Sequence, residues 1–185
     1  MKEMEATGRR LFLGIPPEPS MVHTYEAWRA PVEAHPGVKW TPPEQLHITV
    51  YFFGAVPEAR LDNLKALLGY GLRAHRPFEL RVQGYDWAPP GQEPRMIWVR
   101  YQKTEAFRQL AMDIHRMYVQ IEPAIQMRHS PVPHMTLARF TSPLAMTLPV
   151  RPAMPAQLRV SRLILWESVR SPDGTRYEEI ARFLL

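Results

Sequence analysis

The expected fold is built around the stretch Leu46–Gly54, which reads LHITVYFFG. Val, Ile, Tyr and Phe dominate it, as is typical of a β-strand, and turn-forming glycine and proline close it. Side chains alternate across a strand, so His47 and Thr49 share one face while Ile48 and Val50 share the other. The stretch therefore predicts a strand that buries its aliphatic face and presents an imidazole beside a hydroxyl.

A second stretch, Pro133–Phe140, reads PHMTLARF and repeats the same His-x-Thr pattern. Here the alternation places His134 and Thr136 on one face of a strand. If the two strands face each other, they form a symmetric pocket with two histidines and two threonines. That pocket is the candidate functional site.

The order of elements repeats around these two strands. Leu11, in the apolar run RLFLGI, lies 36 residues before His47 (47 − 11), and Ile97 lies 37 before His134 (134 − 97). Each half thus reads as strand, helix, loop and His-x-Thr strand. We expect an α+β fold that is bilobal, with two pseudo-two-fold-related lobes of antiparallel sheet and outer helices around a central cleft. Residues 1–185 would form a single domain of two intimate lobes.

Hydrophobic periodicity and turn residues place the remaining elements. Ser20 and Thr104 are candidate helix caps, Pro57 opens a helix, Gly84 is a possible bulge and Asp173-Gly174 is a hairpin-type turn. Helices are expected over residues 21–34, 57–71 and 104–118, and further strands over 10–15, 38–41, 78–87, 95–101, 158–167 and 177–184, with a loop over 141–156.

Composition limits the class of protein. Apolar residues make up 45% and charged residues 22% of the 185 residues, which is ordinary for a globular protein. Proline occurs 20 times, which indicates long, stiffened loops. Cysteine is absent, which excludes disulfides, thiolate nucleophiles and Cys-ligated zinc. A reducing cytoplasm is the expected compartment.

Charge and hydropathy leave two interpretations open. The net charge of +5 permits a polyanionic partner such as nucleic acid, but a merely basic surface explains it equally well. The first ten residues mix charges and resemble no secretory signal. No stretch approaches the ~18 apolar residues of a membrane helix, so we expect no membrane partner.

The paired motifs suit acid–base chemistry. Histidine exchanges protons near neutral pH, so two across a pocket can act as one base and one acid. Thr49 and Thr136 would hydrogen-bond the non-bridging oxygens of a phosphate, and Arg139 would offset their charge. A single His-x-Thr is more often structural. Two copies of the motif in the same register favour a catalytic site instead, one suited to in-line displacement at phosphorus.

A metal site is the rival chemistry. It requires spacings such as His-x-x-x-His with a nearby carboxylate, and neither motif has them. His129 lies near His134, but Pro131 and Pro133 intervene. We therefore expect no metal and no cofactor.

With these residues the chain resembles the 2H phosphoesterase superfamily, which has two His-hydrophobic-Thr/Ser-hydrophobic motifs. Within it, the sequence is similar to the RNA 2′,3′-cyclic phosphodiesterases, historically called 2′-5′ RNA ligases. The resemblance implies that His47 is the proton donor, His134 the proton acceptor and Arg139 a phosphate ligand. It implies hydrolysis of a terminal 2′,3′-cyclic phosphate to a 2′-phosphate. It rests on RLFLGI, VKWTPPEQLHITVYFFG, PRMIWV, PVPHMTLARF and LILWESV.

Further residues beside the motifs are candidates for substrate contact. Trp40 and Tyr51 could stack a terminal base, as in readers of single-stranded RNA, whereas core packing is preferred for Phe53. Arg128 and Lys39 could contact phosphates. The family often has Lys where this chain has Tyr51, and Phe and Arg where it has Pro131-Val132, so substrate preference is less defined than reaction type.

Two alternatives remain open. The same site run backwards would join RNA ends by a 2′-5′ linkage, and a protein of another class would bind RNA with an idle pocket. The expected partner is RNA with a 2′,3′-cyclic phosphate end, or a cyclic nucleotide, and the expected state is a monomer.

Overall fold

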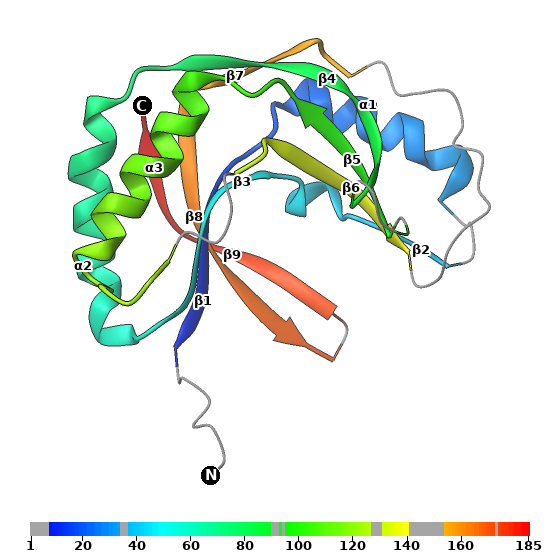
Figure 1. Ribbon diagram of the computed structural model, residues 1–185. Helices are drawn as coiled ribbons and strands as arrows, with labels where there is room; N and C mark the ends of the chain where they lie inside the picture. Colours follow the sequence, from blue (N-terminus) through cyan, green and yellow to red (C-terminus); the bar gives the residue numbers. More distant parts are fainter. Residues whose placement is uncertain are drawn as a thin grey trace.

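Strands of the described chain pair into one curved antiparallel sheet flanked by α-helices (Figure 1). The computed structural model describes residues 8–33, 37–89, 93, 95–126, 131–140, 154–172 and 174–185. The strands are β1 (Arg9–Ile15), β2 (Val38–Trp40), β3 (Ile48–Val56), β4 (Phe78–Ala88), β5 (Met96–Tyr101), β6 (His134–Phe140), β7 (Gln157–Val160), β8 (Arg162–Ser171) and β9 (Gly174–Leu184). The helices are α1 (Pro19–Arg29), α2 (Glu58–Gly71) and α3 (Glu105–Val119), with short 3₁₀ turns at Ala30–Val32, Pro43–Gln45 and Leu72–Ala74.

The two motif strands, β3 and β6, are neighbours at the centre of the sheet. The strand order is β7-β4-β5-β6-β3-β1-β8-β9, and β2 pairs with the C-terminal end of β6. β3 and β6 share one register pair, Ile48 with Met135, and then diverge. The α+β antiparallel fold is confirmed, but the two expected sheets are joined into one at this pair. The divergence beyond it opens the space between the motifs.

Helices α1 and α3 each pack against the half of the sheet that belongs to the other sequence repeat. α3 follows β5 in sequence, yet it packs with α2 and against β3 of the other half. α1 follows β1, yet its Tyr25 bonds to the backbone of β6 and its Trp28 packs edge-on against Trp40 of β2. Figure 1 shows α2 and α3 side by side and α1 at the opposite end. Each sequence repeat therefore contributes its helix to the neighbouring half.

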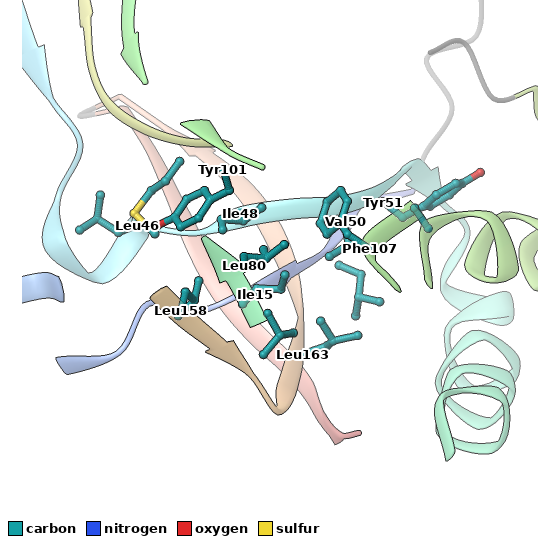
Figure 2. Packing of buried hydrophobic residues seen from close by; sticks show 14 of the residues in the cluster. Ile15, Leu46, Ile48, Val50, Tyr51, Leu80, Tyr101, Phe107, Leu158 and Leu163 are labelled. Carbon is teal, nitrogen blue, oxygen red and sulfur yellow. The ribbon is translucent and has the colours of Figure 1, made fainter. Parts of the chain in front are cut away.

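The aliphatic face of the first motif is buried, as the alternation predicts. Ile48 is 0% and Val50 2% exposed, and they pack with Ile15 of β1 and Leu163 of β8 in the continuous core (Figure 2). Burying such side chains contributes about 1.5–3 kcal/mol each to the folded state. The core thus fixes the register that sends His47 and Thr49 to the opposite face.

Among the predicted elements whose bounds differ from the structure, the first helix and the strand over 158–167 differ most. The first helix begins at Pro19 rather than after Ser20, because proline suits the first turn, where its missing N–H costs nothing. It ends at Arg29, and Pro31 lies in a 3₁₀ turn. The expected strand over 158–167 is two strands that meet at Ser161, since β7 pairs with β4 at one edge while β8 pairs with β1.

Other elements agree with the prediction. Thr104 caps α3, because its Oγ1 accepts a hydrogen bond from the Phe107 N–H at 3.2 Å. Gln83 has no partner in the β4–β5 register, so the bulge lies beside Gly84. Gly174 adopts φ +129° where β8 turns into β9, but Asp173 lies outside the described residues. Most of the predicted loop over 141–156 also lies outside them.

Candidate active site

A cleft of about 540 Å³ lies on the face of the sheet between the motif strands. Its lining includes both motif histidines and both motif threonines, from β6 and from β3 with the residue before it. Arg139 lines it as well. The structure therefore brings together the five residues that the sequence singled out: His47, Thr49, His134, Thr136 and Arg139.

The two imidazoles are held by the same local hydrogen bond. Nδ1 of His47 lies 2.7 Å from the Gln45 carbonyl oxygen, and Nδ1 of His134 lies 2.8 Å from that of Val132. A carbonyl oxygen can only accept, so each Nδ1 carries a proton and donates it. Each Nε2 is then the nitrogen left to take up or release a proton in the reaction. The matching tethers give the two rings the same tautomer.

Both histidines are neutral in the free site at pH 7. Burial is the main cause that lowers the pKa of His47 to about 4; the hydrogen bond to Gln45 partly opposes it, and the charges of Arg139 and of His134, when His134 is protonated, add to it. Burial also lowers the pKa of His134, with a smaller contribution from Arg139. Because opposite charges favour the protonated form, an anionic phosphate in the cleft would raise both values.

The two histidines rest on different aromatic supports. His47 lies among three rings, with centroids 4.8 Å away for Phe12, 5.2 Å for Tyr177 and 5.7 Å for Trp166. His134 stacks on Trp98 of β5, with centroids 3.9 Å apart. These supports restrict each ring to one orientation, a requirement for positioned proton transfer. None of these four rings is predicted from the sequence, because they come from strands distant in the chain.

Gly14 of β1 leaves space for the Trp166 ring that lies beside His47. A Cβ atom there would lie 2.9 Å from the Ile48 carbonyl oxygen and 3.0 Å from the Trp166 ring. It would also lie 3.5 Å from the His47 ring. A glycine at this position therefore permits the close approach of β1 to the first motif.

Each motif strand contains a bulge three residues after its histidine. Val50 has no partner in the register of β1 with β3, and Leu137 has none in that of β5 with β6. An unpaired residue reverses the alternation beyond it. The fifth residue after each histidine consequently turns into the cleft: Phe52 in the first motif and Arg139 in the second.

The bulge corrects one predicted contact. Strict alternation puts Tyr51 on the face of His47, and we expected it to meet substrate. Tyr51 instead lies in the core, 8% exposed, and its hydroxyl bonds to Nδ1 of His115 on α3 at 2.8 Å (Figure 2). Phe52, which is 46% exposed, lines the cleft in its place, with the Arg10 guanidinium 4.8 Å from its ring centroid.

The remaining candidates fare differently. Trp40 is 8% exposed and lines the edge of the cleft, and Lys39 lines it too. Arg128 lies outside the described residues. Phe53 is a core residue, as preferred from the sequence. Among the described residues, no group of three or more His, Asp or Glu side chains could hold a metal ion.

The cleft is strongly basic. Its described lining contains no Asp or Glu, and its cations come from four separate strands. Two of them, Arg10 and Arg170, were not predicted as cleft residues from the sequence. Alternation along the strand does place Arg10 on the same face as Phe12. The tip of the β8–β9 hairpin closes one wall, where the Gln45 side-chain amide donates to the Thr175 carbonyl at 2.9 Å. The four cations are Arg10, Lys39, Arg139 and Arg170.

Comparison with known proteins agrees with this fold and site. Residues 16–172 match the model of the 2′-5′ RNA ligase superfamily. A protein of Methanothermobacter thermautotrophicus named RNA 2′,3′-cyclic phosphodiesterase is 29% identical over 154 residues, 80% of this chain and 83% of that one. One of the same name from Thermus thermophilus is 31% identical over 154 residues, 80% and 76% of the two chains. The chain therefore belongs to the 2′-5′ RNA ligase superfamily.

A solved structure supports the same assignment. A protein of Thermus thermophilus is 29% identical and superposes with a TM-score of 0.79 over 95% of this chain and 97% of that one. The family resemblance read from the paired motifs is thus confirmed. None of the described helices is long and apolar enough to cross a membrane.

Proposed function

We propose that the protein hydrolyses the 2′,3′-cyclic phosphate at the 3′ end of an RNA and leaves a 2′-phosphate. The observation that carries the proposal is the pair of matched imidazoles, each with Nδ1 fixed by a backbone carbonyl, on the walls of one basic cleft. Relatives named RNA 2′,3′-cyclic phosphodiesterase support the substrate class.

The reaction is an in-line displacement at phosphorus. His134 takes a proton from water at Nε2 while the water oxygen attacks the phosphorus atom. The bond from phosphorus to O3′ breaks, and His47 gives its Nε2 proton to the departing oxygen. One imidazole must therefore be neutral and the other protonated when the reaction begins. The phosphate anion supplies the charge that permits this, since it raises both pKa values.

The other cleft residues hold the phosphate and the base. The hydroxyls of Thr49 and Thr136 donate to the non-bridging oxygens, and Arg139 balances the charge that gathers on them in the transition state. Phe52, capped by Arg10, offers an exposed ring on which the terminal base stacks. Lys39 and Arg170 meet phosphates further along the strand. These residues, with the histidines, need no metal ion for the chemistry.

A turnover experiment tests the proposal. An oligonucleotide ending in a 2′,3′-cyclic phosphate is incubated with the protein in excess EDTA, and the phosphomonoester is quantified. We expect full activity in EDTA and a loss of about 10²- to 10⁴-fold in His47→Ala and in His134→Ala. Binding of the RNA without turnover would instead indicate an RNA-binding protein with an idle pocket. Activity that EDTA abolishes and a divalent cation restores would contradict the metal-free mechanism.

A further inference from the structure

Tyr177 of β9 brings a hydroxyl to the His47 side of the cleft. Its half-buried ring stands edge-on to His47, with centroids 5.2 Å apart and planes at 85°, and edge-on to Phe12 at 4.8 Å. It lines the cleft near the tip of the β8–β9 hairpin, where it pairs with Ser168 in the register of the two strands. Packing against His47 needs only the ring, so the hydroxyl is left without a structural role.

The Tyr177 hydroxyl has no hydrogen-bond partner within the described residues. By contrast, the hydroxyls of Tyr25, Tyr51 and Tyr118 each bond to a backbone carbonyl or a histidine in the core. The Tyr101 hydroxyl is unpartnered but buried, whereas that of Tyr177 is accessible from the cleft. A hydroxyl that faces a cleft without a protein partner is available to orient a ligand.

Two guanidinium groups act on this hydroxyl from different strands. Burial raises the pKa of Tyr177, and the charges of Arg139 on β6 and Arg10 on β1 partly oppose that effect. The phenol therefore keeps its proton at neutral pH and remains a donor. The described lining contains no carboxylate that could accept this proton. These surroundings favour an acceptor that is anionic and is supplied by the ligand.

The second histidine has no equivalent donor in its aromatic support. His134 stacks on Trp98, whose Nε1 is buried and lies outside the described lining of the cleft. Of these two supports, only the one at His47 therefore offers a donor to a phosphate held between the histidines. A hydroxyl has one proton, so it donates to one non-bridging oxygen and makes the two oxygens unequal.

We propose that Tyr177 is a further catalytic residue, whose hydroxyl donates a hydrogen bond to one non-bridging oxygen of the cyclic phosphate beside His47. The inference rests on the proposed function, which places that phosphate between the two histidines. Negative charge gathers on the non-bridging oxygens as water attacks, so the bond strengthens in the transition state. The proton transfers are unchanged: His134 takes the proton of water, and O3′ takes that of His47. Tyr177 keeps its own proton throughout.

Tyr177→Phe removes the hydroxyl and keeps the ring that packs against His47 and Phe12. On a nucleoside 2′,3′-cyclic phosphate, kcat/KM should fall by about 10- to 100-fold, the worth of one hydrogen bond to a charged group. The pH maximum should stay at that of the wild type, because the ring and both arginines remain. Tyr70→Phe is the matched control, since Tyr70 is exposed on α2, and it should change neither quantity.

Cyclic phosphorothioates separate contact from support. The two isomers of a nucleoside 2′,3′-cyclic phosphorothioate carry sulfur, a weaker acceptor than oxygen, at one or the other non-bridging position. In the wild type, one isomer keeps the full bond to Tyr177 and the other weakens it. Tyr177→Phe should therefore slow the first isomer more than the second, and change the ratio of their kcat/KM values by about fivefold or more.

Two results would overturn the inference. Equal slowing of both isomers would show that the phenol supports His47 without touching the phosphate, and unchanged rates would show that the hydroxyl is not used. Wild-type protein that fails to hydrolyse the cyclic phosphate would instead refute the proposed function on which the inference rests.

Discussion

The protonation of two imidazoles, those of His47 and His134, determines whether the proposed reaction can begin. Buried among aromatic rings and close to Arg139, both histidines favour the neutral form in the free protein because burial lowers each pKa. Each nonetheless lines a basic cleft whose described lining holds no carboxylate, so an anion can bind there. A bound anion would favour the protonated form of each imidazole. An imidazole of the site can therefore take up or keep a proton when the phosphate binds.

The pH dependence of kcat/KM follows from these lowered pKa values. The active form carries one proton on the pair, and it is most populated midway between the two apparent pKa values of the pair. Both histidine pKa values lie below 6.5, and that of His47 is about 4. We therefore expect a bell for kcat/KM with its maximum below pH 6.5, and a maximum for kcat at higher pH because substrate raises the values.

Rates measured from about pH 4 to about pH 9 test this expectation. Arg139→Gln serves as a second observation, since removing the guanidinium should move the kcat/KM maximum to higher pH besides lowering the rate. A kcat/KM maximum above about pH 7, or a flat profile, would show that free imidazoles with lowered pKa values do not limit the reaction.

The bulges in β3 and β6 determine which side chains enter the cleft. Without them, Phe52 and Arg139 would face the core rather than the cleft. Alternation alone predicted His47, Thr49, His134 and Thr136 correctly as sharing one face, because they precede the bulges. It misplaced Tyr51, because a bulge depends on pairing with another strand and leaves no signal in the strand's own sequence.

Tyr25 of α1 holds the second bulge. Its ring is fully buried, and its hydroxyl lies 2.9 Å from the carbonyl oxygen of the unpaired Leu137 and 2.7 Å from that of Thr41. Tyr25→Phe should lower the free energy of unfolding by about 1–3 kcal/mol, because the hydroxyl proton that the two carbonyl oxygens share is lost and the Leu137 carbonyl keeps only the Thr41 N–H. It should also lower kcat/KM and move the pH maximum upward, as a displaced Arg139 lowers the histidine pKa values less.

Denaturant unfolding and pH–rate profiles check both effects. Tyr118→Phe is a suitable control, since the Tyr118 hydroxyl makes a long bond of 3.5 Å to the Phe53 carbonyl in the core. The control should retain the wild-type pH maximum. If Tyr25→Phe is less stable but keeps the wild-type kcat/KM and pH maximum, Tyr25 supports the fold without positioning Arg139.

The cleft is formed by both halves of the sheet. β3 supplies one half of the motif pair and β6 the other, and they pair with each other at a single register position. The exchanged helices connect the halves further, since α1 contacts β6 and α3 contacts β3. The two histidines are thus parts of one unit.

A double mutant tests that unit. In the proposed reaction, His47→Ala and His134→Ala each remove one proton-transfer group, and each leaves the other without a partner in the same step. The double mutant should therefore be far more active than the product of the two single losses predicts, because groups that act as a unit are not additive. Single-turnover rates on one cyclic substrate measure this. Fully multiplicative losses would indicate that the histidines act in separate steps.

Local signals in the sequence were sufficient for most elements but not for their assembly. The strand character of the motifs, the Thr104 cap and the helix after Pro57 were all readable from nearby residues. The division at Ser161 was not, because β7 pairs with β4 and β8 with β1, which lie far apart in the strand order. The aromatic supports of His47 and His134 were missed for the same reason.

The isomer of the product reports which ribose oxygen leaves, and so which histidine stands beside it. Wild-type protein is given a dinucleotide ending in a 2′,3′-cyclic phosphate, and the products are separated by chromatography or phosphorus NMR. A fixed cleft with His47 beside O3′ and His134 beside water predicts a 2′-phosphate as the single product. A 3′-phosphate, or a mixture of both isomers, would contradict the assigned roles of the two histidines.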